Sequence, residues 1–358
     1  MSESRQLISD SIHRIFRDAV TPQMLAAFEE GHWPAELWTT VADNGFHRLL
    51  DIDGSAALDW DDAQPALFAL GYYRVPLPLG ETLLANWLCA RAGLAVAEGP
   101  QTVVDGEGLA FERAADGRWT VSGTVQRVPW ARVAQRFVIA GSAGGQQLIG
   151  VCGNDPSSVA IDAGRNLSAE PRDEVRFTRC PLQGVGFDAR LPRDPVKLYG
   201  ALVRAVCMAG AANSVLDQSV QYVNDRKQFG RALAKFQAVQ HLLAELGEEC
   251  AAVTMAATAA CAAAGSATAP LEIAVAKVRA GQMAARVPRI AHQVHGAMGF
   301  TYEYSLHFGT RRLWAWRREF GSDAAWASQI GLAAIAAGQE GFWPRIMTGS
   351  DMAAGQQL

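Results

Sequence analysis

The sequence has 358 residues, with 32 Lys and Arg against 36 Asp and Glu, which gives a formal net charge of −4. Such a chain lacks the surplus of basic side chains that neutralises a phosphate backbone, so nucleic-acid binding is not expected. Hydrophobic residues make up 49% and charged residues 19% of the sequence, which excludes an intrinsically disordered chain and suffices for a large buried core. The length suggests two or three domains.

The cysteines are spread along the chain without any Cys-x-x-Cys pair. This spacing predicts small buried thiols in a reducing compartment, and neither a metal site nor a disulfide framework. The N-terminal segment carries charges every few positions, unlike a signal peptide, and no long window is apolar enough to cross a membrane. We therefore expect a cytoplasmic protein that binds neither metal nor membrane. The cysteines are Cys89, Cys152, Cys180, Cys207, Cys250 and Cys261.

Residues 1–100 are predicted to form an N-terminal helical domain. Apolar residues recur with the period of an α-helix in the segments ISDSIHRIF, MLAAFEEGHWPAELWTTVADNGF and LLANWLCARAGL. Gly45 and the run Pro76-Leu77-Pro78 interrupt this pattern, as residues that end or separate helices do.

Residues 101–192 are predicted to form a middle antiparallel β-barrel. The segments TVVDG, WTVSGTVQRV, RFVIAGSAGGQQLIGV and EVRFTRC are short, rich in Val and separated by Gly. Asp116-Gly117 predicts a tight hairpin turn. The glycine-rich run 141–145 resembles a phosphate-binding loop, but no helix follows it, so a second hairpin turn is favoured.

Residues 193–345 are predicted to form a C-terminal four-helix bundle, followed by a tail at residues 346–358. Glycines near positions 230, 265 and 296–299 supply the turns between the helices. The whole chain is thus expected to be mainly α with a central β domain. The four helices are expected near Lys197–Arg226, Lys235–Ala264, Pro270–Ala297 and Gly309–Gln339.

One candidate site lies where the first bundle helix ends, in the segment DRKQFGRALAKFQ. Arg226 can grip a diphosphate with paired hydrogen bonds, and Phe229 can offer an apolar face to a ribose or a ring. Gln237 follows at the start of the next helix. An ordinary helix end with a solvated arginine would have the same pattern.

A second candidate site lies in the segment QVHGAMGFTYEY. Gly296 and Gly299 allow close approach of a ligand to the backbone, and Gln293 precedes them by one helical turn with an amide that can bind it. A helix C-cap followed by a turn is the alternative interpretation of this spacing.

These two segments resemble the signature pair of the acyl-CoA dehydrogenase family. The family's order of a helical domain, a β domain and a four-helix bundle matches the order predicted above. The resemblance implies an FAD-dependent oxidation of a CoA thioester to the 2,3-enoyl form, with electrons passed to an electron-transfer flavoprotein. It implies that the ADP half of FAD is held by Arg226, Phe229, Gln237, Gln293, Gly296 and Gly299, across the interface of a homodimer or homotetramer.

The same resemblance requires a carboxylate base near the end of the bundle. Counted without gaps, the position at which most members carry a glutamate is Phe320, and the one used by a few members, in the first bundle helix, falls near Gly200. Glu319 is the carboxylate adjacent to the first position and is the candidate catalytic residue.

The β domain also departs from the family pattern. It lacks the Glu-Pro and Ala-Gly-Ser-Asp runs and the Trp-(Ile/Val)-Thr run, where Trp130 is a substitute for stacking on flavin or a core residue. These losses resemble short bacterial members in which two unlike subunits share one flavin site. The alternative function is therefore a non-catalytic or half-site subunit of a heteromeric acyl-CoA dehydrogenase.

Overall fold

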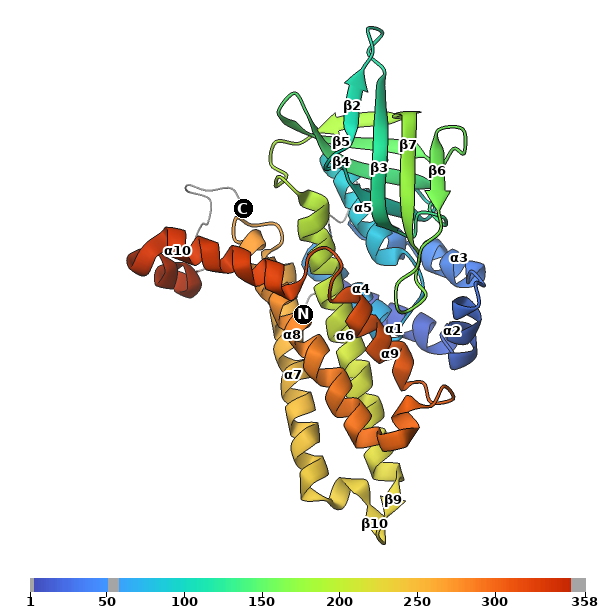
Figure 1. The fold of residues 1–358 in the computed structure, drawn as a ribbon, viewed down its shortest axis with the longest axis vertical. Helices are drawn as coiled ribbons and strands as arrows, with labels where there is room; N and C mark the ends of the chain where they lie inside the picture. Colours follow the sequence, from blue (N-terminus) through green and yellow to red (C-terminus); the bar gives the residue numbers. More distant parts are fainter. Residues whose placement is uncertain (1–2, 51–57, 349–358) are drawn as a thin grey trace. The chain divides into compact units, whose positions relative to one another are not determined.

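The computed structural model describes residues 3–50 and 58–348 (Figure 1). Helices form its N-terminal part, strands its middle part and helices again its C-terminal part. This order confirms the predicted fold class. Residues 349–358, most of the predicted tail, lie outside the described residues.

The N-terminal helices include one that is buried on nearly all sides. Every residue of α5 from Leu79 to Ala90 is buried, so this helix is a core element. Gly45 has φ 75°, which only glycine adopts without strain, and α3 ends just before it. The elements are α1 (Glu3–Ala19), α2 (Pro22–Glu29), α3 (Ala35–Asp43), the 3₁₀ turn η1 (Phe46–Arg48), α4 (Trp60–Tyr72) and α5 (Leu79–Arg91).

The middle part contains two four-stranded sheets, with strand orders β1-β4-β5-β8 and β2-β3-β7-β6. All neighbouring strands in them are antiparallel except β1 and β4, which pair in parallel and are connected through β2 and β3. The strands are β1 (Gln101–Asp105), β2 (Ala110–Arg113), β3 (Trp119–Pro129), β4 (Arg136–Ala143), β5 (Gln146–Gly153), β6 (Val159–Asp162), β7 (Arg172–Pro181) and β8 (Gly184–Phe187).

Both predicted hairpin turns are present. Gly117 has φ 86° between β2 and β3, and Gly144 and Gly145 both have positive φ between β4 and β5, as a two-residue hairpin turn requires. The two sheets share one apolar core that includes Val121, Phe137 and Phe177. All six cysteines are buried, as their spacing predicted.

The C-terminal part differs from the prediction in its last helix. The expected helix at Gly309–Gln339 is two helices, because a turn at residues 317–322 separates α9 from α10. Phe320 and Gly321 in this turn have φ of 53° and 97°, which a helix does not allow. The elements are α6 (Pro195–Asp225), β9 (Lys227–Gln228), β10 (Arg231–Ala232), η2 (Leu233–Lys235), α7 (Gln237–Ala263), α8 (Ala269–His295), η3 (Gly296–Phe300), α9 (Leu306–Trp316) and α10 (Asp323–Thr348).

Helix α6 is a long, apolar helix of the bundle. By length and composition it could cross a membrane, so the expectation that no long window is apolar enough was wrong. However, 94% of its most apolar window is buried inside the structure, as in the core helix of a bundle. A Cβ on Gly210 would lie 2.0 Å from the carbonyl oxygen of Phe68, and one on Gly71 would lie 1.9 Å from that of Cys207. Small residues here therefore let α4 and α6 approach closely.

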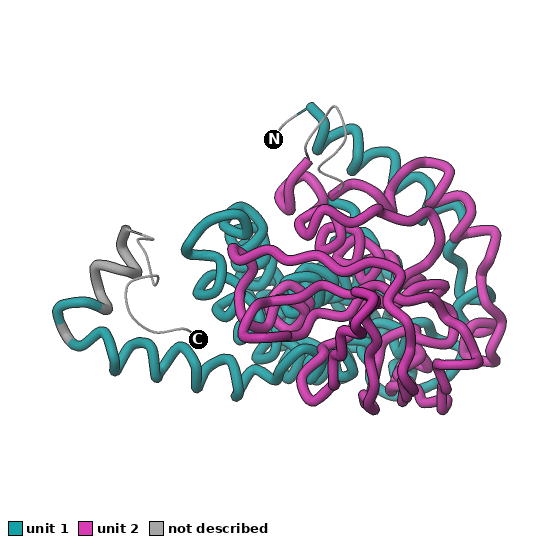
Figure 2. Tube along the Cα trace, turned by 90° about the horizontal axis from the view of Figure 1, so that it is seen from above, with its two compact units in different colours: residues 1–25, 64–75, 201–358 teal, residues 26–63, 76–200 magenta. Residues whose placement is uncertain are grey.

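The chain divides into two compact units, drawn in teal and magenta in Figure 2. Unit 1 contains residues 1–25, 64–75 and 201–358, and unit 2 contains residues 26–63 and 76–200. Both units combine segments that are far apart in the sequence. The domain boundaries at residues 100, 192 and 345 stay predictions.

Candidate functional site

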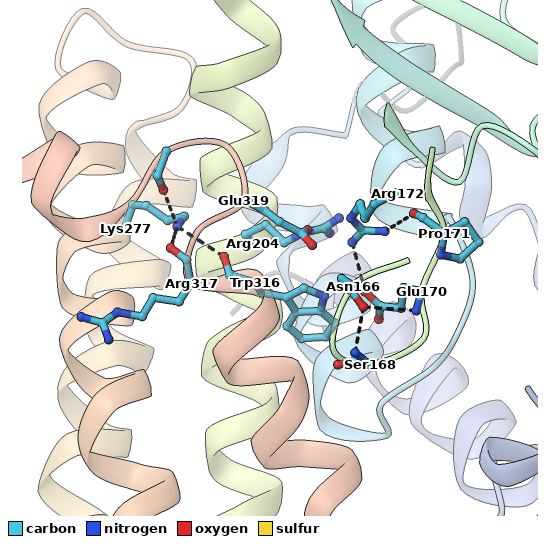
Figure 3. Close-up of polar contacts among 11 residues, drawn as sticks. Asn166, Ser168, Glu170, Pro171, Arg172, Arg204, Lys277, Trp316, Arg317 and Glu319 are labelled. Carbon is cyan, nitrogen blue, oxygen red and sulfur yellow. Dashed lines mark hydrogen bonds and ion pairs between the residues drawn. The ribbon is translucent and has the colours of Figure 1, made fainter. Parts of the chain in front are cut away.

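The turn at residues 317–322, here called the α9–α10 turn, places the candidate base against a buried arginine. Glu319 Oε2 accepts a hydrogen bond from Arg204 Nε of α6 over 2.6 Å. Glu319 is 8% exposed and Arg204 is 3% exposed. Figure 3 shows the carboxylate beside the guanidinium. Water screens such a pair weakly, so the two charges interact strongly.

Arg204 is also enclosed by aromatic rings. Its guanidinium carbon lies 5.7 Å from the ring centroid of Trp316 and 5.5 Å from that of Phe320. Both distances are within the range of cation–π attraction. The arginine is thus held from two sides by rings at the end of α9 and in the α9–α10 turn.

Lys277 of α8 also contacts the α9–α10 turn. This side chain is fully buried, and Nζ donates to the carbonyl oxygens of Arg317 and Gly321, both over 2.8 Å, and to that of Trp316 over 3.5 Å (Figure 3). Burial lowers the pKa of Lys277 to about 8, while the nearby charges of Glu319 and Asp323 oppose this shift.

Contacts within the C-terminal helices fix the rest of the α9–α10 turn. Arg317 pairs with Asp323 through two hydrogen bonds of 3.1 and 2.8 Å, and the hydrogen bonds from this arginine lower the pKa of the Asp323 carboxyl. Trp326 Nε1 donates to the carbonyl oxygen of Phe320 over 3.0 Å. The turn is therefore tied to α6, α8 and α10.

The backbone of this turn is unusual at Phe320, the position to which ungapped counting assigns the base. A φ of 53° is rare for a residue other than glycine, asparagine or aspartate. Such conformations cost free energy and cluster at functional sites. That Glu319 acts as a base remains a prediction, and in this arrangement a proton would compete with Arg204 for its carboxylate.

The first group of predicted cofactor residues lies at the exposed end of α6 and the start of α7. Arg226 and Gln237 are exposed. Phe229 is 89% exposed and lies at the tip of the β9–β10 hairpin, with φ 53°. This aromatic side chain faces solvent within the chain, as a residue that contacts a ligand or another subunit would.

The second group lies at the C-terminal end of α8. Gln293 and Gly296 are exposed and Gly299 is buried. Gly296 has φ 60°, and a Cβ built on it would meet nothing within 4 Å. The backbone at Gly296 is therefore open to close approach. A Cβ on Gly299 would lie 2.9 Å from the Cβ of His295, so this glycine serves internal packing.

The structure brings these two groups to the same end of the bundle. Tyr222, one turn before Arg226, stacks on His295 with ring centroids 4.4 Å apart, and its hydroxyl donates to the carbonyl oxygen of His295 over 3.1 Å. An exposed guanidinium, two exposed amides and an open glycine backbone thus share one end of unit 1. This donor set fits a diphosphate-containing nucleotide.

Unit 2 contains a buried polar network that the sequence did not predict. Glu170 Oε2 accepts hydrogen bonds from Arg172 Nη2 and Asn166 Nδ2, each over 3.0 Å, and the Asn166 side chain accepts from the backbone of Ser168 (Figure 3). Arg172 and Glu170 are both buried.

Trp130 is also buried, near the rings of Phe28 and Trp33, so it is a core residue.

Arg204 and Lys277 were missed as well, although the sequence holds a signal for each. Lys277 occupies a position of α8 whose neighbours at helical spacing, Ile273 and Ala284, are buried. A charged residue on such an apolar stripe needs a specific partner. Arg204 likewise interrupts the otherwise apolar run Ala201–Ala212.

Comparisons with known proteins agree with this architecture. Residues 198–333 match the family model described as acyl-CoA dehydrogenase, C-terminal domain. The acyl-CoA dehydrogenase IpdE2 of Mycobacterium tuberculosis is 25% identical over 316 residues, which cover 87% of this chain and 91% of the relative. These findings confirm the resemblance to the acyl-CoA dehydrogenase family, and residues 198–333 match its C-terminal domain.

Solved structures share the fold along almost the whole chain. A chain of the ChsE4–ChsE5 complex from Mycobacterium tuberculosis is similar with a TM-score of 0.82 and 20% identity, over 93% of this chain and 97% of that chain. Butyryl-CoA dehydrogenase from Megasphaera elsdenii has a TM-score of 0.81 and 18% identity, over 93% and 98%. The acyl-CoA dehydrogenases to which the chain is similar are FAD-dependent oxidoreductases.

Proposed function

We propose that this acyl-CoA dehydrogenase homologue is a cytoplasmic subunit of an FAD-dependent enzyme that oxidises a CoA thioester to its 2,3-enoyl form. In this reaction the α-proton passes to a carboxylate base, and FAD, when bound, accepts the β-hydride. The electrons then pass to an electron-transfer flavoprotein. The similarity to acyl-CoA dehydrogenases and the two exposed groups at the end of the bundle support this proposal.

The residues of this chain that fit FAD are those at the end of unit 1. Arg226 would pair with the diphosphate, Gln237 and Gln293 would donate amide hydrogen bonds, and Gly296 would let the nucleotide approach the backbone. Phe229 would cover an apolar face. Because these side chains point to solvent within the chain, they would serve a flavin shared with another subunit.

We further propose that the base comes from a second, unlike subunit. The observation that carries this proposal is the buried ion pair of Glu319 with Arg204. A catalytic base must accept a proton from the substrate. If Glu319 were the base, its protonation would disrupt the buried ion pair with Arg204, which is costly. The position that would hold the base by ungapped counting is Phe320. The similarity to a chain of the ChsE4–ChsE5 complex, a complex of two different proteins, supports this arrangement.

A self-sufficient homodimeric or homotetrameric enzyme is the second candidate function. The observation that favours it is that Glu319 lies in the α9–α10 turn, one residue before the counted position. In that enzyme Glu319 would leave Arg204 when the thioester binds.

The visible spectrum of the chain purified alone distinguishes the two functions. We expect little bound flavin and no bleaching by acyl-CoA thioesters in anaerobic solution. Flavin binding and bleaching should appear when the chain is co-expressed with an acyl-CoA dehydrogenase-like chain encoded beside it. Stoichiometric flavin that a thioester bleaches in the chain alone would refute the heteromeric proposal. It would then require Glu319→Gln to be tested as a loss-of-base variant.

A further inference from the structure

We propose that Lys277 is the positioning residue of the α9–α10 turn, holding the backbone that places Glu319 on Arg204 and Phe320 at the counted base position. The contacts of Lys277 carry the structural part of this inference, and its kinetic part rests on the second candidate function, in which Glu319 of this turn is the base. Lys277 donates to three carbonyl oxygens of this turn and of the end of α9. It therefore acts on the backbone of the turn and not on the ligand.

The end of α9 explains why an ammonium is needed. The last carbonyl groups of a helix have no partner within the helix and carry its negative dipole end. Lys277 binds those of Trp316 and Arg317, then reaches past the turn to Gly321. One cation thus closes the end of α9 and fixes the path of the chain toward α10.

A gain in folding stability alone does not explain why a lysine is buried at position 277. Burying an ammonium costs free energy that a methionine of similar length would avoid. The fully buried position of Lys277 stabilises one particular backbone path, in which Phe320 keeps φ 53°. A strained residue, a buried carboxylate and a buried cation that binds the same six-residue turn indicate a positioned site.

Lys277→Met tests the inference by hydrogen exchange of the peptide that spans residues 316–326. We expect its protected amides to exchange on the order of tenfold faster, because the carbonyls of the turn lose their donor. Arg279→Met is the matched control, since Arg279 lies two residues along α8 and pairs with Glu249 of α7. The control should leave the turn peptide unchanged. Unchanged exchange in Lys277→Met would overturn the inference.

Kinetics of the flavin-loaded complex separate positioning from a purely structural role. Where Glu319 is the base, we expect the kcat of thioester-dependent flavin reduction in Lys277→Met to fall on the order of tenfold with the KM within twofold, as a misplaced reacting group predicts. Faster exchange with an unchanged kcat would reduce Lys277 to a structural residue. A wild-type protein that takes up no flavin with any partner would refute the proposed function, and the exchange result alone would then decide whether Lys277 holds the turn.

The wild-type chain provides a test if Lys277→Met does not fold. Exchange of the same peptide, corrected for the intrinsic base-catalysed rate, should fall between pH 7 and 9.5, because an opening of the turn that frees Lys277 takes up a proton. A peptide inside α7 serves as the internal reference. A corrected rate for the turn that stays flat over this range would overturn the inference.

Discussion

Glu319 and Arg204, 115 residues apart in the sequence, form a buried ion pair with a separation of 2.6 Å. The pair joins the α9–α10 turn to the first third of α6. It places the only carboxylate of that turn, which runs from Arg317 to Ser322, in contact with a permanent cation. The chemistry available to Glu319 therefore depends on Arg204.

Removal of one member of this pair should destabilise the protein strongly. Glu319→Leu leaves the Arg204 guanidinium buried without this partner, which costs about 3–5 kcal/mol. The double variant Arg204→Met/Glu319→Leu should recover part of that loss. Urea unfolding of the two single variants and the double variant gives the coupling free energy. Additive effects of the two substitutions would show that the pair makes no net contribution.

Arg226→Ala should weaken FAD binding without destabilising the fold. Loss of a charge-assisted hydrogen bond to the diphosphate costs about 2 kcal/mol, or roughly thirtyfold in the dissociation constant. Lys227→Ala is the control, because Lys227 is an exposed cation in the same hairpin. Flavin fluorescence titration of the assembled protein measures both. Equal weakening in the two variants would show that general charge, and not Arg226, attracts the cofactor.

Gly321→Ala should distort the α9–α10 turn. A Cβ at this position would lie 2.6 Å from Trp326 Nε1, and its φ of 97° is unfavourable for alanine. We expect a loss of stability of about 1–3 kcal/mol. Gly331→Ala in α10 is the matched control, since nothing lies within 4 Å of its Cβ, and it should be neutral or stabilising. Thermal unfolding that ranks the two variants in the opposite order would contradict the described turn.

The titration of Lys277 should make stability rise with pH. Its folded-state pKa of about 8 lies below the value of 10.5 expected for an unfolded lysine. Between these values the unfolded chain binds more protons, so the free energy of unfolding increases as pH rises from 8 toward 10.5. Lys277→Met should show a smaller slope in this window. Equal slopes in urea unfolding at a series of pH values would exclude this contribution of Lys277.

Patterns along the sequence predicted the order of the elements, the hairpin turns and the burial of the cysteines. The order of helical and β segments follows from hydrophobic periodicity, and the glycines at 117, 144 and 145 mark the hairpin turns that the structure contains. The six cysteines are buried as predicted. The helices, strands and hairpin turns are local features, because each depends on residues that are close in the sequence.

The split of the last predicted helix into α9 and α10 shows what periodicity misses. The segment at Gly309–Gln339 keeps a helical pattern on both sides of the α9–α10 turn, and the turn is held by Lys277 and Arg204 from other helices. Contacts at long sequence separation override local propensity there. The parallel pairing of β1 with β4 is of the same kind, since it depends on which strands become neighbours.

The sequence by itself therefore determined the class of fold, the hairpin turns, the burial of the cysteines and the resemblance on which the cofactor residues were chosen. Only the tertiary structure decided that Glu319 is paired with Arg204, that Lys277 binds the backbone beside it, and that the segments around Arg226 and Gly296 share one end of the bundle. The physical reason is that hydrophobic patterning and turn preferences act over a few residues. The pairing of buried charges is set by the packing of α6, α8 and the α9–α10 turn in three dimensions.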